Sequence, residues 1–202
     1  MKINKIYRNK MYLDTGEIMD ISPFIRQKYD LKVNNEIERF YDEVSYEASL
    51  EKGIFLISLK DRTKKEVRLK LEEKYRNKAA ILRAIEKLEE FGYLNDLNYA
   101  MSYIESRTYG KNRISYNLFQ KGINKDLVEK AYLTLDEEKE ENVEDVKLEK
   151  LIEKKGKKVN VNNERDEKKI KEEQKLIQYL ARQGFSLDKI FKKLKEYKGN
   201  YE

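Results

Sequence analysis

The chain repeats a short stretch of its own sequence, and this repeat limits the possible folds more than any other feature. Leu118–Asp126 reads LFQKGINKD and Leu180–Asp188 reads LARQGFSLD. Each copy combines a Gly that ends a helix, an apolar residue that packs back, a polar N-cap and an Asp near the next helix start. Six residues after the Gly, each copy has a β-branched residue, Val128 or Ile190. One copy is typical of any helix-turn-helix, but two with the same spacing favour a duplicated unit.

A weaker copy precedes these two. Thr63 is expected to cap a helix that carries Val67 and Leu71, and a helix over 79–91 follows, with Tyr75 in the place of the Gly. A three-helix unit buries too little apolar surface to be stable alone, so neighbouring units must stack into an elongated, curved array. We therefore predict an N-terminal segment over 1–45 and three-helix repeats over 46–95, 96–137 and 138–202.

The scarcity of helix breakers favours an all-α chain, since 202 residues contain one Pro and eight Gly. The exception is the N-terminus, where Met11–Leu13 and Ile18–Ile21 flank a turn signal and predict a small β-hairpin. Ser22 and Pro23 then predict the start of a short helix that ends near Asp30.

The helical period predicts two amphipathic helices in the next part of the chain. The apolar face of the first is expected at Tyr46, Leu50, Ile54 and Ile57. The apolar face of the second is expected at Ile81, Ala84, Ile85 and Leu88. Gly92 should end the second helix, because Gly readily takes the left-handed conformation that closes a helix.

The composition excludes much of enzyme chemistry. The chain has no Cys and no His, and therefore no disulfides, thiolate zinc ligands, thiol nucleophiles or imidazole bases. Its Gly residues are scattered, and none forms a phosphate-binding loop. Adjacent acids such as Glu72 and Glu73 point apart on a helix and do not converge on a metal. We predict a protein that is not an enzyme and uses no cofactor or metal.

Membrane insertion is not expected. The longest wholly apolar run in the body of the chain is Ile54–Ile57, far shorter than the roughly 20 residues that span a bilayer. The first residues lack the apolar segment of a secretory signal, so we expect a cytoplasmic protein. The formal net charge of +6 is weak evidence for a nucleic-acid partner, and the position of the charges is more informative.

Basic residues cluster in the middle unit. Residues 101–125 have a local balance of +4, with Glu105 as the only acid. Tyr103, Tyr109 and Tyr116 stand nearby, which is typical of a surface that stacks on bases or on a protein, although the apolar period favours a core position for Tyr103. Most other charges are expected on solvated helix faces. An acidic linker is predicted over 136–141 and a mobile basic loop over 154–163.

A further set of motifs runs through all three predicted repeats. The central motifs are Leu88–Asp96 (LEEFGYLND), Tyr99–Ala100, Arg107, Gly110, Arg113–Ile114, Leu118 and Lys121–Ile123. Leu180–Ser186 belongs to the third repeat, and Arg62 and Thr63 to the first. Together these motifs cover roughly residues 46–196, about three quarters of the chain. They resemble the signature of the RecX family, bacterial regulators of the RecA recombinase. Tyr75 and the long third repeat depart from the family pattern.

The resemblance implies a non-enzymatic protein of tandem three-helix repeats that lies in the helical groove of the RecA filament on single-stranded DNA. There it would impede ATP hydrolysis, strand exchange and coprotease activity, and so regulate recombination, DNA repair and the SOS response. We expect a monomer that contacts the filament through cations at related places in the repeats, because cations suit an acidic groove. The candidate contact residues are Arg62, Lys65, Arg107, Lys111, Arg113, Lys121 and Arg182.

Two other classes of function stay open at this point. The first is a direct DNA-binding protein built from helix-turn-helix-like units. Asp126 and Glu129 at the start of the last helix of the middle unit argue against base reading there, although weak, salt-sensitive DNA binding is expected. The second is a generic helical scaffold, which explains the composition but not the repeats with their basic loop.

Overall fold

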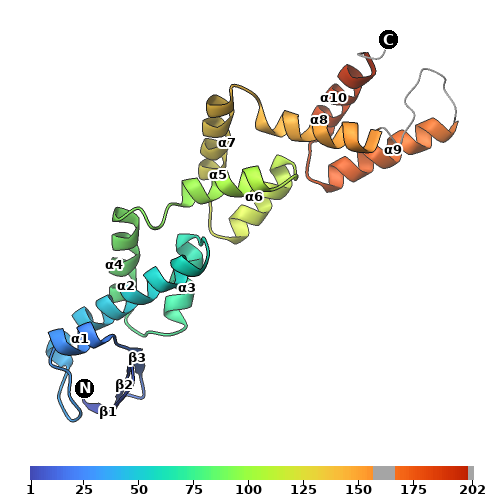
Figure 1. Cartoon of the computed structure of the whole chain (residues 1–202). Coiled ribbons are helices and arrows are strands. Elements are labelled where there is room, and N and C mark those ends of the chain that lie inside the picture. The colour runs from blue at the N-terminus through green and yellow to red at the C-terminus, as the bar shows by residue number, and fades with distance from the viewer. Residues whose placement is uncertain (157–166, 200–202) are drawn as a thin grey trace. The chain divides into compact units, whose positions relative to one another are not determined.

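The computed structural model describes residues 1–156 and 167–199. This part of the chain is mostly helical, with a small three-stranded sheet at its N-terminus (Figure 1). It divides into two compact units, residues 1–96 and 97–202, which are described separately below. The N-terminal elements are β1 (Ile3–Tyr7), β2 (Lys10–Leu13), β3 (Ile18–Asp20), α1 (Pro23–Lys28) and a 3-10 turn η1 (Glu38–Phe40). The helices that follow are α2 (Tyr41–Leu59), α3 (Lys64–Glu72), α4 (Lys78–Glu90), α5 (Asp96–Ser106), α6 (Lys111–Gln120), α7 (Lys125–Lys139), α8 (Val143–Gly156), α9 (Glu167–Arg182) and α10 (Leu187–Gly199).

The N-terminal sheet contains the predicted hairpin and one strand more. Strands β2 and β3 form the hairpin, and β1 pairs antiparallel with β2 in the order β1-β2-β3. The sequence analysis missed β1 because its alternation of apolar and polar residues is interrupted by a register shift between Ile3 and Lys5. Ile3, Met11 and Met19 point from the three strands into the core, where all three are buried.

The predicted short helix α1 begins as expected. The Ser22 side-chain oxygen accepts a hydrogen bond of 3.2 Å from the amide of Ile25, and Pro23 occupies the first helical position. The helix ends at Lys28, slightly before the predicted end near Asp30, which has a positive φ of 46°.

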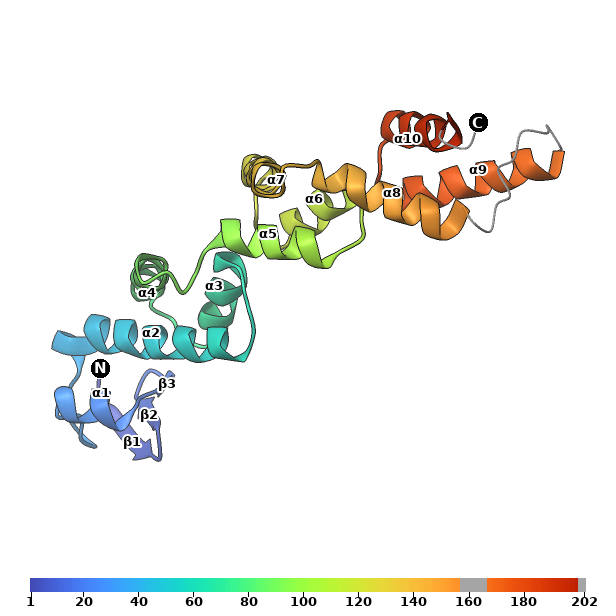
Figure 2. The same ribbon diagram turned by 45° about the horizontal axis from the view of Figure 1, so that its top comes forward.

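The predicted apolar face of α2 is only partly correct, since Leu50 and Ile57 are half-buried and pack against the core. Ile54 is 42% exposed, and the buried side chains include Val44, Ala48 and Leu56 together with small residues. A Cβ at Gly53 would lie only 2.6 Å from Leu88 Cδ1, so the small residues of α2 allow α4 to approach closely. This close packing, with the sheet on the other side of α2, selects the buried face (Figure 2).

The predicted Gly stops close three helices in the same way. Gly92, Gly122 and Gly184 have positive φ values of 74°, 89° and 95°. After Gly122 the amide of Ile123 donates back to the carbonyl of Leu118 at 3.0 Å, and the residues after the other two Gly make equivalent bonds. These bonds satisfy carbonyls that a helix end leaves free, as in the Schellman motif.

Tyr75 replaces the Gly in the first copy without a left-handed backbone. Its side chain is buried, and its hydroxyl donates to the carbonyl of Ala48 at 3.4 Å. The capping box that starts this copy is present, since the Thr63 side chain and Glu66 bond to each other's backbone amides. The beginning of the first copy therefore matches the prediction, while its turn is built from an aromatic residue.

The buried apolar residues form three clusters. The first joins the sheet to α2–α4, the second lies mainly among α5–α7, and the third lies among α8–α10. The predicted repeat boundaries stay predictions. The predicted acidic linker over 136–141 is mostly helix, because α7 continues to Lys139. Of the predicted basic loop over 154–163, residues 154–156 belong to α8 and the others lie outside the described residues.

Candidate functional site

Two stacked rings with a cation at each end run along α5 in the middle of the chain. Tyr99, Tyr103 and Arg107 are spaced by one helical turn each, so they share a face. The Tyr99 and Tyr103 rings are stacked, with centroids 6.4 Å apart and an interplanar angle of 15°. The Arg107 guanidinium lies 5.4 Å from the Tyr103 centroid, and the Lys121 ammonium lies 5.5 Å from the Tyr99 centroid. We call Lys121, Tyr99, Tyr103 and Arg107 the aromatic row.

The aromatic row is accessible from solvent at several points. Arg107 is exposed, while Lys121 and both rings are half-buried. The expectation that Tyr103 is a core residue is only partly correct, because one part of its ring packs against the second core cluster. A cation above an aromatic face is held by the ring quadrupole without losing its charge. The row therefore presents positive charge and flat apolar surface together.

The loop between α5 and α6 is fixed against the turn between α9 and α10. The amide of Gly110 donates to the carbonyl of Gln183 at 2.9 Å, and the amide of Asn112 donates to the carbonyl of Gly184 at 3.1 Å. A Cβ at Gly110 would lie 2.4 Å from the carbonyl carbon of Gly184, so the two backbones touch without side chains between them.

Arg113 belongs to this junction. Its guanidinium carbon lies 3.9 Å from the Tyr109 centroid, and Nη1 donates to Gln183 Oε1 at 3.3 Å. Arg182 precedes Gln183 in the chain and is exposed. The structure thus brings two predicted contact residues, Arg113 and Arg182, to one turn, with Arg113 engaged in holding that turn.

Lys111 is also engaged inside the second unit. Its ammonium pairs with Glu129 Oε2 at 2.5 Å and lies 5.1 Å from the Tyr132 centroid. Its backbone amide donates to Glu144 Oε1 at 2.7 Å. The charge of Lys111 is therefore partly compensated, which weakens it as a contact for an external anion.

Arg62 and Lys65 lie in the first unit, at the connection between α2 and α3. Arg62 is half-buried, and its Nε donates to the carbonyl of Leu56 at 3.1 Å, which caps the end of α2. Lys65 is exposed on the first turn of α3. Of the seven predicted contact residues, the exposed ones are Lys65, Arg107 and Arg182.

The sequence analysis named Tyr99 as part of a motif but not as a candidate contact residue, and it did not name Glu144. A search for aromatic and basic residues one turn apart would have found Tyr99, because it stands four positions before Tyr103 and eight before Arg107. No local signal identifies Glu144, whose role depends on the fold. It is buried, and besides the Lys111 amide it contacts the Lys189 ammonium at 2.8 Å.

A half-buried amine lies near the end of α5. Lys147 of α8 donates from its ammonium to the carbonyl of Ile104, and burial lowers the pKa of Lys147 to about 8. The nearby Glu144 and Glu105 carboxylates oppose this lowering of the pKa. Lys147 therefore satisfies a helix-end carbonyl next to the aromatic row, and its position is structural.

The described part of the chain shows neither a metal-binding cluster nor a membrane-spanning helix. Within residues 1–156 and 167–199, His, Cys, Asp and Glu side chains do not gather into a group that could hold a metal ion. None of the helices in this described part combines the length and the apolar character that crossing a bilayer requires.

Comparison with known proteins places this site in a family. A sequence model described as "RecX, second three-helix domain" matches residues 95–131, which include the whole aromatic row. Regulatory protein RecX of Clostridium beijerinckii is 30% identical over 198 residues, covering 93% of this chain and 90% of the relative. Regulatory protein RecX of Clostridium acetobutylicum is 32% identical over 196 residues, covering 94% and 89%.

Solved structures agree with the sequence relatives. The crystal structure of RecX from Lactobacillus salivarius has a TM-score of 0.62 and 29% identity, and the match covers 75% of this chain and 96% of that one. A second crystal structure, of a regulatory protein RecX, has a TM-score of 0.60 at 23% identity and supports the fold alone. The chain belongs to the RecX family of regulatory proteins.

Proposed function

We propose that this protein binds the RecA filament on single-stranded DNA and slows its ATP hydrolysis, strand exchange and coprotease activity. Membership of the RecX family supports a regulatory role. The observation that carries the contact hypothesis is the aromatic row, which lies within the matched second three-helix domain and combines accessible cations with aromatic surface. In the same proposal the protein is a cytoplasmic monomer without catalytic activity.

Arg107 is the residue on which the proposal depends most. Its guanidinium lies over the Tyr103 ring and is exposed, so its planar fork can still bind a carboxylate or a phosphate with two hydrogen bonds. Arg62, Lys111 and Arg113 are already held by internal partners. In our proposal the exposed Arg107, Lys65 and Arg182 contact the filament together with the half-buried Lys121 of the aromatic row. Arg62, Lys111 and Arg113 support the folded repeats.

The test is the ATPase rate of RecA on single-stranded DNA while the protein is added in substoichiometric amounts. Inhibition at concentrations that leave naked DNA unbound supports binding to the filament. Inhibition only at concentrations that saturate naked DNA would instead favour the alternative, a direct DNA-binding protein. No inhibition at any concentration would contradict the proposal.

Reversing the charge of Arg107 tests whether this residue contacts the filament. Arg107→Glu should weaken inhibition by about tenfold, since it removes a charge-assisted contact and introduces repulsion. Lys130→Glu is the matched control, because Lys130 is exposed on α7 and is not a member of the aromatic row. Equal inhibition by the two variants at physiological salt would show that Arg107 is not a contact residue.

A further inference from the structure

On strands β1 and β2 the outer face of the N-terminal sheet alternates aromatic and basic residues, while β3 places Ile18 and Asp20 beside them. Antiparallel pairing sets Lys5 opposite Tyr12 and Tyr7 opposite Lys10. The other face of the same strands is buried in the core. Because side chains alternate along a strand, the register itself places these four side chains on the open face. Each ring on these two strands therefore has a cation as its cross-strand neighbour.

The cations on this face lie over the rings. The Lys5 ammonium is 5.4 Å from the Tyr7 centroid and 5.8 Å from the Tyr12 centroid. The Arg8 guanidinium carbon is 5.4 Å from the Tyr7 centroid, and the Tyr7 side chain remains 54% exposed. Arg8 has a φ of 52°, a left-handed conformation that is uncommon for a residue with a long side chain.

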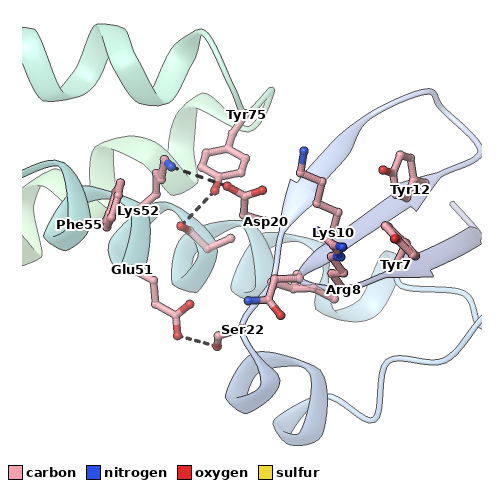
Figure 3. Close-up of a pocket in the computed structure, with 13 residues that line it drawn as sticks. Tyr7, Arg8, Lys10, Tyr12, Asp20, Ser22, Glu51, Lys52, Phe55 and Tyr75 are labelled. Carbon is pink, nitrogen blue, oxygen red and sulfur yellow. Dashed lines mark hydrogen bonds and ion pairs between the residues drawn. The ribbon is translucent and has the colours of Figure 1, made fainter.

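A pocket of about 670 Å³ opens beside this face (Figure 3). Tyr7, Arg8 and Lys10 line it from the sheet, and Lys52 and Phe55 line it from α2. Its volume is in the range of sites that accept a ligand the size of a nucleotide. The Lys52 ammonium lies 4.7 Å from the Phe55 centroid, so the pattern of cation over ring continues across the pocket.

The charge balance of this region is positive. Residues 1–13 contain Lys2, Lys5, Arg8 and Lys10 and no acid. Of the two carboxylates that line the pocket, Asp20 pairs with Lys52 and Lys74. Glu51 lies on α2, across the pocket from the sheet, and accepts from the neutral Ser22 hydroxyl at 2.7 Å. An anionic ligand would therefore meet mainly the positive charges of the sheet.

We propose that the outer face of this sheet, with its pocket, binds single-stranded nucleic acid. Bases would stack on Tyr7 and Tyr12, and phosphates would contact Lys5, Arg8 and Lys10. Base stacking on aromatic rings within a basic surface is the general mode of single-strand binding, and it requires bases that a duplex keeps covered. An acidic peptide would use the cations but not the two open rings. This site is independent of the filament contact proposed for the aromatic row.

The test is binding of a fluorescently labelled oligothymidine by the full chain, followed by anisotropy. Combined Tyr7→Ala and Tyr12→Ala should weaken binding at least about tenfold, because stacking contributes strongly for each base. Phe191→Ala is the control, since Phe191 is an aromatic residue that is 54% exposed on α10, in the other unit, and belongs to neither proposed site. Combined Tyr7→Phe and Tyr12→Phe keeps the rings and should retain affinity, which separates stacking from a folding defect.

Salt dependence tests the role of the cations. Combined Arg8→Ala and Lys10→Ala should lower the slope of log affinity against log salt by about one for each phosphate that the variant no longer neutralises. Wild-type affinity in the double Tyr→Ala variant, or equal affinity for a duplex of the same length, would overturn the proposal. The same loss of affinity with the two Phe substitutions would also overturn it.

The RecA ATPase assay separates this site from the filament proposal. The double Tyr→Ala variant should lose affinity for naked single strands while it still inhibits RecA through the aromatic row. Full loss of oligothymidine binding with unchanged inhibition supports the sheet site, whichever result Arg107→Glu gives. Unchanged oligothymidine binding excludes the sheet site and leaves the filament proposal to its own test.

Discussion

The backbone amide of Lys111 donates a hydrogen bond of 2.7 Å to the carboxylate of Glu144, which is only 5% exposed. The amide of Lys64 donates to the carboxylate of Asp96 in the same way, at 2.9 Å. Lys64 and Lys111 are the first residues of α3 and α6, and each acid stands in the first turn of a later helix. A carboxylate at a helix N-terminus accepts a hydrogen bond from an otherwise unpaired amide and interacts favourably with the positive end of the helix dipole.

Glu144→Ala should destabilise the protein. The substitution leaves the Lys111 amide without its acceptor and removes one of the partners of Lys189. We expect the free energy of unfolding to fall by about 2 kcal/mol, the usual cost of an unsatisfied buried group. Urea unfolding followed by circular dichroism measures it. Glu138→Ala, at an exposed position of α7, should change the free energy of unfolding little. An equal loss of stability in this control would show that Glu144 has no special role.

Gly110→Ala should be more damaging than Gly92→Ala. The added methyl at Gly110 would overlap the backbone of Gly184, whereas a Cβ at Gly92 meets nothing within 4 Å and carries only the strain of a φ of 74°. We expect losses of about 3 kcal/mol and about 1 kcal/mol respectively. Chemical denaturation compares the two variants. Equal losses would mean that the close approach of the two backbones relaxes easily.

Lys147 should make stability depend on pH in the alkaline range. Its pKa is about 8 in the folded protein against 10.5 for the free side chain, so between these values the unfolded chain binds more protons. The contribution of Lys147 to the free energy of unfolding therefore rises with pH from about 8 to 10.5. The N-terminal amine, whose pKa is raised from 8.0 by Glu38, acts in the opposite direction. Above pH 10 so do Tyr41 and Tyr75, whose pKa values burial raises.

The comparison with Lys147→Met isolates this effect. Both proteins share the N-terminal amine and the buried tyrosines, so the difference between their urea midpoints at pH 8 and pH 10 reports Lys147 alone. The wild-type protein should gain stability relative to the variant as the pH rises. A constant difference would show that the pKa of Lys147 is close to its ordinary value.

Ser49→Ala should stabilise the protein slightly. The Ser49 hydroxyl is buried in α2, and among the described residues it has no hydrogen-bond partner. Removing a buried, unpaired hydroxyl relieves its desolvation cost, so we expect a gain of about 1 kcal/mol. Thermal unfolding measures the gain. Ser58→Ala is a control of the same chemistry, since the exposed Ser58 hydroxyl donates to the carbonyl of Phe55 at 2.9 Å and its loss should not stabilise.

The features that the sequence predicted correctly are local ones. The Gly stops at Gly122 and Gly184 and the caps at Ser22 and Thr63 depend on a few neighbouring residues, so their pattern is visible in the chain. The buried face of α2 was predicted only in part, because it is selected by how closely α4 approaches Gly53. Hydrophobic periodicity carries no information about that distance.

The sequence showed which residues cluster at the candidate site, but not which of them are available to bind a partner. The cluster of cations around Arg107 is visible in the sequence, and so is the spacing of Tyr99 and Tyr103. That Arg113 is engaged with Gln183 could not be predicted, because the two residues are 70 positions apart and meet only through the docking of two turns. Charge counting therefore identifies the basic region around Arg107, whereas tertiary contacts determine which of its cations are available to bind a partner.

The carboxylate of Asp96 limits where the chain can be cut into stable fragments. It completes the start of α3 although it is itself the first residue of α5, so a boundary drawn between helices would cut through a bond that the earlier helix needs. A fragment that ends at Asn95 would lose this acceptor, and one that retains Asp96 would keep it. The first two repeats are therefore not interchangeable modules, since the acid that completes α3 or α6 comes from the sequence of the following repeat.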